Sequence, residues 1–225
     1  MAGNQIECIS LTKQYNSKNK TVTAVDDINL CIGKNELVLL KGRSGAGKST
    51  LLNLMCGLIK PTRGKVMLDN DCISEMSDDS LSVLLTEKTG IIFQSFNLLP
   101  TYTVYENIEI ALVPKGPDRN LIRDNIYTML GQFNLKEKAG LIPSELSVGQ
   151  QQKVAIIRTL IKQPVVIFAD EPTGSVDDET AAEIMEHLLY LKNEKQVTLV
   201  IATHGNIPDK VADRIFMIEN GRIKN

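Results

Sequence analysis

The sequence predicts an α/β fold with a mostly parallel sheet, an antiparallel β part and an inserted helical part. Two apolar runs, 37–40 and 165–169, indicate buried strands, the first followed by a glycine-rich loop and the second by two acids. Between them, from 103 to about 163, the apolar spacing is helical. A chain of 225 residues is long enough for one domain of this kind with a smaller subdomain inserted in it.

The first elements are two runs of alternating apolar and polar residues, 6–11 and 22–32. They predict two strands that pair antiparallel. Tyr15 lies between them in a predicted polar turn with Asn16 and Ser17.

The loop after the strand 37–40 runs from Gly42 to Thr50, and a helix with an apolar face that includes Leu58 is predicted to follow. Gly42, four residues, and then Gly47-Lys48-Ser49 form the P-loop pattern in its required strand–loop–helix context. Glycines let backbone N–H groups approach a triphosphate, and the helix N-terminus favours anions. We expect Lys48 to reach the β- and γ-phosphates and Ser49 to offer its hydroxyl to Mg²⁺. The candidate nucleotide-binding residues of the loop are Gly42, Arg43, Ser44, Gly45, Ala46, Gly47, Lys48, Ser49 and Thr50.

Three elements lead from the P-loop helix to the helical block: a strand at 65–68, a helix through 87 with Ser77 as its N-cap, and a short strand at 90–93 that leads to Gln94. Gln94 either lines a phosphate site or caps a loop. Tyr15 either stacks on the base of a nucleotide or packs as an edge-strand aromatic. The neighbouring residues leave both alternatives open.

The helical block is predicted to contain helices at 103–111 and 120–133, with a loop at 114–117 between them. Its last part begins with Leu-Ser-Val-Gly-Gln at 146–150 and continues as a helix through 162. Ser147 and Gly149 stand where this helix begins, so a hydroxyl and a bare backbone N–H point out from its positive end. The pattern indicates a second phosphate-binding site or an ordinary N-cap.

The strand 165–169 ends in Asp170 and Glu171, at the edge of the sheet where open α/β folds bind their ligands. We expect Asp170 to hold Mg²⁺, directly or through a water, and Glu171 to accept a proton from the attacking water. A helix at 178–192 and a buried strand at 197–202 follow, and the strand leads to His204. An imidazole in that place suits a hydrogen bond to a terminal phosphate. An alternating run at 213–219 and a hairpin turn complete the chain.

Composition narrows the possible partners and the location. The formal net charge of -2 and the pI near 5.8 give no electrostatic footprint for nucleic acid. No apolar run approaches the roughly 20 residues that span a bilayer, and the first residues lack a signal-peptide pattern, so a cytoplasmic chain is expected. Scattered spacing predicts reduced, structural thiols at all four cysteines: Cys8, Cys31, Cys56 and Cys72.

These motifs, in this order, resemble the nucleotide-binding subunits of ATP-binding cassette (ABC) transporters over essentially the whole chain. The resemblance is carried by 42–50 (Walker A), Gln94 (Q-loop), 146–150 (signature), 165–171 (Walker B), 175–177 (D-loop) and His204 (switch histidine). It implies a single ABC ATPase domain, 1–225, with a P-loop NTPase core and antiparallel β part at about 1–95 and 164–225. A helical subdomain would occupy about 96–163.

The resemblance also implies roles for the residues. Glu171, His204 and Gln94 would be catalytic, and Ser49, Gln94 and Asp170 would hold Mg²⁺. Beside the P-loop, the ATP-binding residues would be Tyr15, Ser147, Gly149, Gln150 and Asp177. Two copies would dimerise head to tail around two ATP, so that the signature of one covers the P-loop of the other. The dimer would bind an integral permease at the cytoplasmic face of the membrane.

Finer stretches, 93–100, 103–107, 150–155 and 169–174, are similar to the lipoprotein-releasing and macrolide-exporting ATPases. That subfamily works with permeases that have few membrane spans and a large extracytoplasmic domain. The expected function is to power such a permease. The alternative is a subunit of the divisome or peptide-resistance type, which transmits force or a signal and moves no cargo.

Three positions depart from the family pattern. Val148 replaces the usual glycine of the signature, and its β-branched side chain restricts the backbone. Gly205 follows His204 where this subfamily usually has aspartate. Ser175-Val176 replaces the more usual Asn-Leu.

Overall fold

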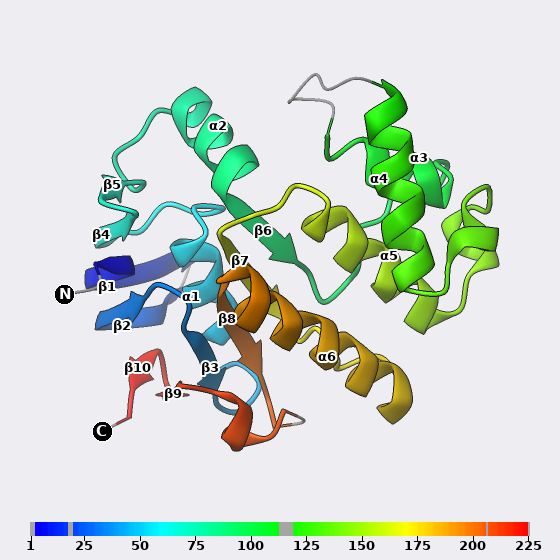
Figure 1. Cartoon of the computed structure of the whole chain (residues 1–225). Helices are drawn as coiled ribbons and strands as arrows, with labels where there is room; N and C mark the ends of the chain where they lie inside the picture. The colour runs from blue at the N-terminus through cyan, green and yellow to red at the C-terminus, as the bar shows by residue number, and fades with distance from the viewer. Residues whose placement is uncertain (1–2, 18–19, 113–118, 206, 225) are drawn as a thin grey trace.

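The computed structural model describes residues 3–17, 20–112, 119–205 and 207–224 and contains two sheets (Figure 1). The six-stranded sheet has the order β10-β9-β3-β8-β7-β6, in which the strands from β9 to β6 are parallel and β10 pairs antiparallel with β9. The four-stranded sheet, β2-β1-β4-β5, is antiparallel throughout. The predicted combination of a mostly parallel sheet with an antiparallel β part is confirmed.

The bounds of the strands are β1 (Asn4–Ser17), β2 (Lys20–Gly33), β3 (Leu37–Lys41), β4 (Arg63–Leu68), β5 (Asp71–Cys72), β6 (Thr89–Ile92), β7 (Val166–Asp170), β8 (Thr198–Thr203), β9 (Arg214–Glu219) and β10 (Arg222–Ile223). The helices are α1 (Lys48–Met55), α2 (Asp78–Lys88), α3 (Val104–Glu109), α4 (Arg119–Gln132), α5 (Val148–Leu160) and α6 (Asp178–Lys195). Helices α3, α4 and α5 gather on one side of the molecule, away from the antiparallel sheet (Figure 1).

The six-stranded sheet separates two apolar cores. Leu37 and Leu39 of β3 belong to a core shared with α3, α4, α5 and α6, whereas Val38 and Leu40 belong to a core shared with α1 and the antiparallel sheet. All four side chains are fully buried. Successive residues of a strand point to opposite faces, so a strand covered on both faces must be apolar throughout. This explains why the sequence here shows a continuous apolar run.

Side chains cap four of the helices at their N-termini. Ser77, Thr103, Ser147 and Asp177 each accept a hydrogen bond from the backbone N–H three residues further on. Thr103 and Ser147 belong to complete capping boxes, with Glu106 and Gln150 as the reciprocal partners. A cap of this kind stabilises its helix by about 1 kcal/mol. The predicted helix starts after Ser77, Thr103 and Ser147 are therefore confirmed.

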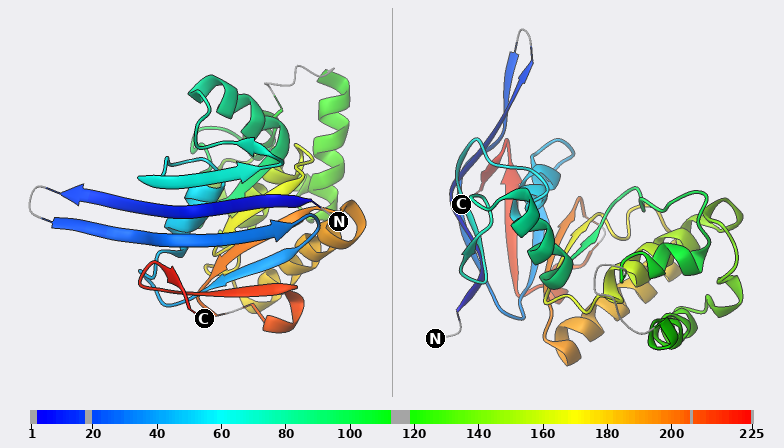
Figure 2. Two further views of the ribbon diagram at one scale, coloured as in Figure 1. Left: turned by 90° about the vertical axis from the view of Figure 1, so that its left-hand side faces the viewer. Right: turned by 90° about the horizontal axis from the view of Figure 1, so that it is seen from above.

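Two predicted elements differ from the structure. Tyr15 is not in a turn but in β1, opposite Val22 of β2, because the hairpin extends well beyond the alternating apolar residues (Figure 2). Residues 14–16 of β1 are exposed, and no apolar alternation marks this end of the strand in the sequence. Leu58 lies beyond α1, which ends at Met55, because Gly57 adopts a left-handed φ of 74°. The loop predicted at 114–117 lies outside the described residues.

All four cysteines are free; Cys8 and Cys56 are buried, as the prediction of structural thiols requires, whereas Cys31 is exposed and Cys72 is partly exposed. Burial raises the pKa of the Cys8 thiol to about 12, and the same cause raises the pKa of Cys56 to about 12. Both thiols are therefore inert structural side chains near neutral pH.

Candidate active site

A cavity of about 420 Å³ lies where four parallel strands end. Strand β3 leads into the P-loop, β6 into Gln94, β7 into Glu171 and β8 into His204. The residues that line the cavity are Ala24, Ser44, Gly45, Gly47, Lys48, Ser49, Thr50, Gln94, Glu171 and His204. The parallel sheet thus brings together residues that are far apart in the chain, at the edge where such sheets bind ligands.

Two glycines of the P-loop lie too close to neighbouring backbone atoms to be replaced by a residue with a side chain. A Cβ on Gly42 would lie 2.2 Å from the carbonyl oxygen of Ile218, and a Cβ on Gly47 would lie 2.2 Å from the carbonyl oxygen of Ala24. Both glycines also have a positive φ, of 156° and 104°. Only glycine fits these positions, which fix the loop against β9 and β2.

The N-terminus of α1 is available to an anion. Gly47 is its N-cap, and within the described residues no side chain caps it and no acid lies in its first turn. Helices α2 and α6, in contrast, have both a side-chain cap and acids in the first turn. The free N–H groups of α1 and its positive dipole end therefore remain at the cavity, where they favour phosphate.

Lys48 lies folded over the P-loop. Its Nζ donates hydrogen bonds to the carbonyl oxygens of Gly42, at 2.9 Å, and Arg43, at 3.2 Å, and the residue is only 7% exposed. These bonds compensate the burial of the charged amine and hold it at the cavity wall. The position suits contact with the phosphates of a nucleotide.

Asp170 is the last residue of β7, and the Ser49 hydroxyl donates a hydrogen bond to its carboxylate. Burial raises the pKa of Asp170 above its ordinary value, and the nearby Glu171 charge raises the pKa further, whereas Ser49 and Lys48 oppose the shift. A cation beside this carboxylate would relieve the cost of burying its charge.

The donors at this place fit Mg²⁺. Ser49 and Asp170 supply hard oxygen ligands, and Gln94, which lines the cavity together with Ser49, carries an amide oxygen of the same kind. Among the described residues, no group of three or more His, Cys, Asp or Glu is placed to hold a metal. Mg²⁺ commonly takes one or two protein carboxylates and completes its shell with phosphates and waters.

Glu171 and His204 form a direct pair, with 2.7 Å between Glu171 Oε1 and His204 Nδ1. The Glu171 backbone has a left-handed φ of 47°, which is unusual for a residue with a side chain and costs about 1–2 kcal/mol. Its N–H donates to Ala202 O at 2.9 Å, and its own carbonyl accepts from Gly174 N at 3.1 Å. Backbone bonds on both sides hold this conformation, which directs the carboxylate into the cavity.

Several predicted site residues do not line the cavity. Ser147 and Gln150 form the capping box of α5, and Asp177 caps α6. Ser147 is exposed, and its neighbour Val148 is 49% exposed. The other predicted residues outside the lining are Tyr15, Gly42, Arg43, Ala46, Gly149 and Asp170. Of these, Gly42 and Arg43 contact Lys48 through their carbonyl groups, and Asp170 contacts the cavity-lining Ser49.

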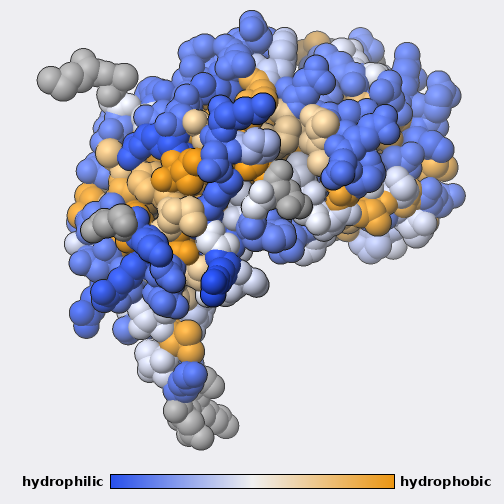
Figure 3. Space-filling view, turned by 90° about the horizontal axis from the view of Figure 1, so that it is seen from below, coloured by the Kyte–Doolittle hydropathy of each residue, from blue (hydrophilic) through white to orange (hydrophobic). Residues whose placement is uncertain are grey.

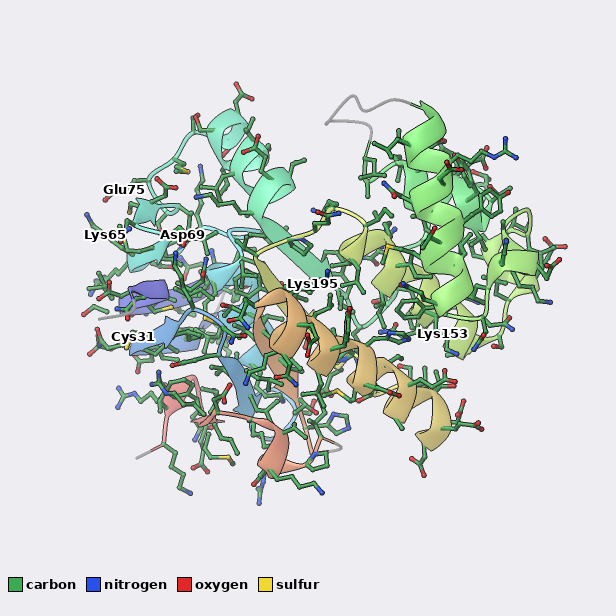
Figure 4. The ribbon with its side chains drawn as sticks, in the orientation of Figure 1. Cys31, Lys65, Asp69, Glu75, Lys153 and Lys195 are labelled. Atoms are coloured by element: carbon green, nitrogen blue, oxygen red, sulfur yellow. The ribbon has the colours of Figure 1, made fainter. Side chains whose placement is uncertain are left out.

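Two contacts of α5 were not predicted, one with the loop after Glu171 and one with α6. Gln152 of α5, 2% exposed, donates from Nε2 to the carbonyl oxygen of Pro172 at 2.8 Å. Lys153, labelled in Figure 4, lies between α5 and α6 and pairs with Glu183. Polar residues of an amphipathic helix are expected to face solvent, so the sequence did not predict these contacts. Ala24 lines the cavity from β2 and was also not predicted, because a small residue in a strand gives no sign of a binding site.

The fold and the cavity define a P-loop nucleotide-binding protein. The family model described as ABC transporter matches residues 25–174. The chain belongs to the ABC transporter family.

Two curated relatives and one solved structure illustrate the similarity. The ABC transporter ATP-binding protein YtrE of Bacillus subtilis (strain 168) is 38% identical over 215 residues, which cover 96% of this chain and 93% of the relative. The lipoprotein-releasing system ATP-binding protein LolD of Blochmanniella floridana is 35% identical, over 96% of this chain and 92% of that protein. The dimeric structure of the ATP-binding cassette MJ0796 in a post-hydrolysis state, bound to ADP and Pi, matches with a TM-score of 0.93 and 35% identity and covers 98% of this chain and 97% of that one.

These similarities confirm the predicted ABC ATPase fold and the predicted activity. The chain is an ABC-type ATP-binding subunit that hydrolyses ATP and dimerises.

Proposed function

We propose that this chain powers an integral membrane permease of the lipoprotein-release and macrolide-export type, as a dimer that closes around two ATP. One observation carries the dimeric part of the proposal. The P-loop, Gln94, Glu171 and His204 surround one cavity, whereas Ser147 and Gly149 lie outside it on a solvent-facing helix start. A second copy would complete each site by placing its Ser147 and Gly149 over the P-loop of the first.

The residues then have separate tasks. Lys48 and the N-terminus of α1 bind the β- and γ-phosphates, and Tyr15 stacks on the base. When bound at Ser49, Asp170 and Gln94, Mg²⁺ would neutralise charge on these phosphates. Glu171 accepts the proton of the attacking water, and His204 holds the terminal phosphate and orients Glu171 through the pair they form. Residues at about 96–163 move as a helical subdomain when the dimer closes, because Gln94 connects this part to the cavity.

The role of Tyr15 is supported by the register of the hairpin. Tyr15 lies opposite Val22, and Val22 is two residues from Ala24, which lines the cavity. The ring is 47% exposed, with Lys13 Nζ 5.4 Å from its centroid. An aromatic side chain at this place would cover a base that extends beyond the cavity.

Replacing Tyr15 with alanine should weaken ATP binding about 5- to 150-fold, since one base–aromatic stack contributes about 1–3 kcal/mol. Calorimetric titration with ATP measures the dissociation constant. Tyr15→Phe keeps the ring and serves as the matched control, with an affinity close to that of the unchanged protein. Equal affinities for all three proteins would make Tyr15 an ordinary edge-strand aromatic.

A groove next to Gln94 is a suitable site for a permease helix. It encloses about 500 Å³ between α2, α5 and the end of α3. Leu58 and Ile110 line it and are 44% and 40% exposed, beside Arg158, whose guanidinium donates to the Phe96 and Asn97 carbonyl oxygens. The groove thus combines apolar side chains with positive charge. It fits a short amphipathic helix with an acidic residue, presented by a permease at the membrane surface.

The permease is also what would hold the chain at the membrane. None of the described helices is long and apolar enough to cross a bilayer. Seen from below, hydrophobic residues form separate patches among hydrophilic ones (Figure 3). A permease helix bound in the groove would place the chain at the cytoplasmic face of the membrane.

The experiment is to tag the chain in its native cells, extract the membranes in mild detergent and identify what co-purifies. We expect an integral membrane protein with a large extracytoplasmic domain. Leu58→Asp should abolish its recovery, because an acid in the groove repels an acidic partner. Val83→Asp is the matched control, since Val83 is 59% exposed on α2 but does not line the groove. Equal recovery with both variants would contradict the docking site.

Assays of the purified complex also distinguish a transporter from a subunit that transmits force. Cargo that accumulates in vesicles on addition of ATP supports a transporter. An extracytoplasmic enzyme that is activated by ATP turnover, with no cargo moved, supports the alternative of a signalling or mechanical subunit.

A further inference from the structure

Lys41 is a charged residue at the end of the central strand β3, at the point where the chain enters the P-loop. It stands in register with Thr203 of β8 on one side and Met217 of β9 on the other. Its side chain is only 14% exposed. An ammonium group in such a place needs acceptors to compensate the loss of water.

The acceptors of Lys41 lie in the segment that follows His204. Lys41 Nζ donates to the carbonyl oxygen of Ile207 at 2.9 Å and also pairs with the carboxylate of Asp209. Ile207 is buried, with 1% exposure, whereas the Asp209 side chain is 71% exposed. One side chain therefore joins the strand before the P-loop to the segment after the switch histidine.

Among the described residues, few other contacts fix the segment next to His204: the Gly205 N–H donates to Thr203 Oγ1 at 3.4 Å, and Ile207 packs in the core shared with the helices. Gly205 has a φ of 146°, and the position of its missing Cβ has no heavy atom within 4 Å. Residue 205 thus supplies no side-chain contact. Before His204, the segment is held by the pairing of Thr203 with Lys41, and after it by the Lys41 side chain. The same residue of β3 anchors both ends of the segment that presents the imidazole.

We propose that Lys41 is a positioning residue for ATP hydrolysis: by binding Ile207 and Asp209, it holds His204 at the distance from Glu171 that the closed site requires. This inference rests on the role proposed above for His204. A shift of the segment would lengthen the 2.7 Å contact between His204 Nδ1 and Glu171 Oε1. Small errors of position in a catalytic site lower turnover strongly while binding is little affected.

The first test is steady-state ATP hydrolysis by the purified chain. Lys41→Met should lower kcat about fivefold to tenfold with KM for ATP within about twofold of the unchanged protein, because only positioning is lost. Lys41→Arg, which can still donate to both acceptors, should recover about half of the activity. Asp209→Asn, at an exposed position, should give a smaller loss in the same direction. The matched control is Lys192→Met, because Lys192 is 19% exposed and pairs with Asp213 at 3.2 Å, remote from the cavity lining.

The second test uses NMR to report the environment of His204 directly, and it does not depend on ATP turnover. The chain has two histidines, so the imidazole signals of His204 and His187 are resolved by NMR, with His204→Ala for assignment. Lys41→Met should shift the His204 signals and leave those of His187 unchanged, whereas Lys192→Met should move neither. Unchanged His204 signals in Lys41→Met or in Asp209→Asn would overturn the proposal, whatever the activity.

His204→Ala distinguishes this proposal from the proposed catalytic role. If His204→Ala keeps full turnover, the role of His204 is wrong, while the NMR shift still decides whether Lys41 positions it. If His204→Ala loses turnover and Lys41→Met keeps it, the role of His204 stands and that of Lys41 is contradicted.

Discussion

Replacing Glu171 with glutamine is expected to lower ATP turnover by about 10²- to 10³-fold, while ATP binding remains intact. Glutamine keeps the shape of the side chain but cannot accept a proton from water, and general-base catalysis contributes roughly this factor. The Glu171 carboxylate lines the cavity and pairs with His204, so no other described carboxylate in the cavity lining can replace it. Steady-state phosphate release measures the loss.

The same variant should accumulate as a closed dimer when ATP is present, because hydrolysis is the step that reopens the dimer. Light scattering coupled to gel filtration reports the mass with and without ATP. Glu186→Gln, on the exposed side of α6 outside this cavity, is the control and should retain normal turnover. If Glu171→Gln hydrolyses ATP at the rate of the unchanged protein, the assignment of the general base is wrong.

Replacing Lys48 with alanine is expected to weaken ATP binding by about tenfold to 100-fold. The ammonium forms charge-assisted hydrogen bonds with phosphate oxygens, and such bonds contribute about 1.5–3 kcal/mol. The variant also leaves the carbonyl oxygens of Gly42 and Arg43 without the donor that they have now. Calorimetry with ATP measures the change in dissociation constant.

A surface lysine provides the control for Lys48. Lys60 pairs with Asp78 at 2.8 Å, but both side chains are largely exposed, so Lys60→Ala should leave affinity unchanged. An affinity of Lys48→Ala equal to that of Lys60→Ala would remove Lys48 from the phosphate site.

The sequence predicts those parts of the site that depend on a local pattern of neighbouring residues. The P-loop depends on glycines at fixed spacing, and the structure places Gly42 and Gly47 where no side chain fits. Glu171 and His204 follow strands that are buried on both faces, and such strands are recognised by their continuous apolar runs. Because parallel strands end at one edge of a sheet, their positions in the chain already bring these residues together.

The parts that the sequence does not predict depend on contacts between distant residues. Lys41 and Gln152 are polar residues beside apolar ones, and nothing in their neighbourhood indicates that they bind Ile207 and Pro172. The end of β1 lacks apolar alternation, so Tyr15 was wrongly predicted to lie in a turn. Long-range side-chain partners of this kind are set by packing, not by local pattern.

The account requires that Ser147 of one copy meet the P-loop of the other, and cysteine cross-linking tests this most directly. Ser44 lines the cavity, and Ser147 is exposed outside it. Both are replaced by cysteine in one Glu171→Gln chain from which the accessible native thiols, Cys31 and Cys72, have been removed. We predict a covalent dimer under mild oxidation with ATP and none without ATP, and no dimer in either single-cysteine variant. A chain that stays monomeric with ATP would contradict the composite site.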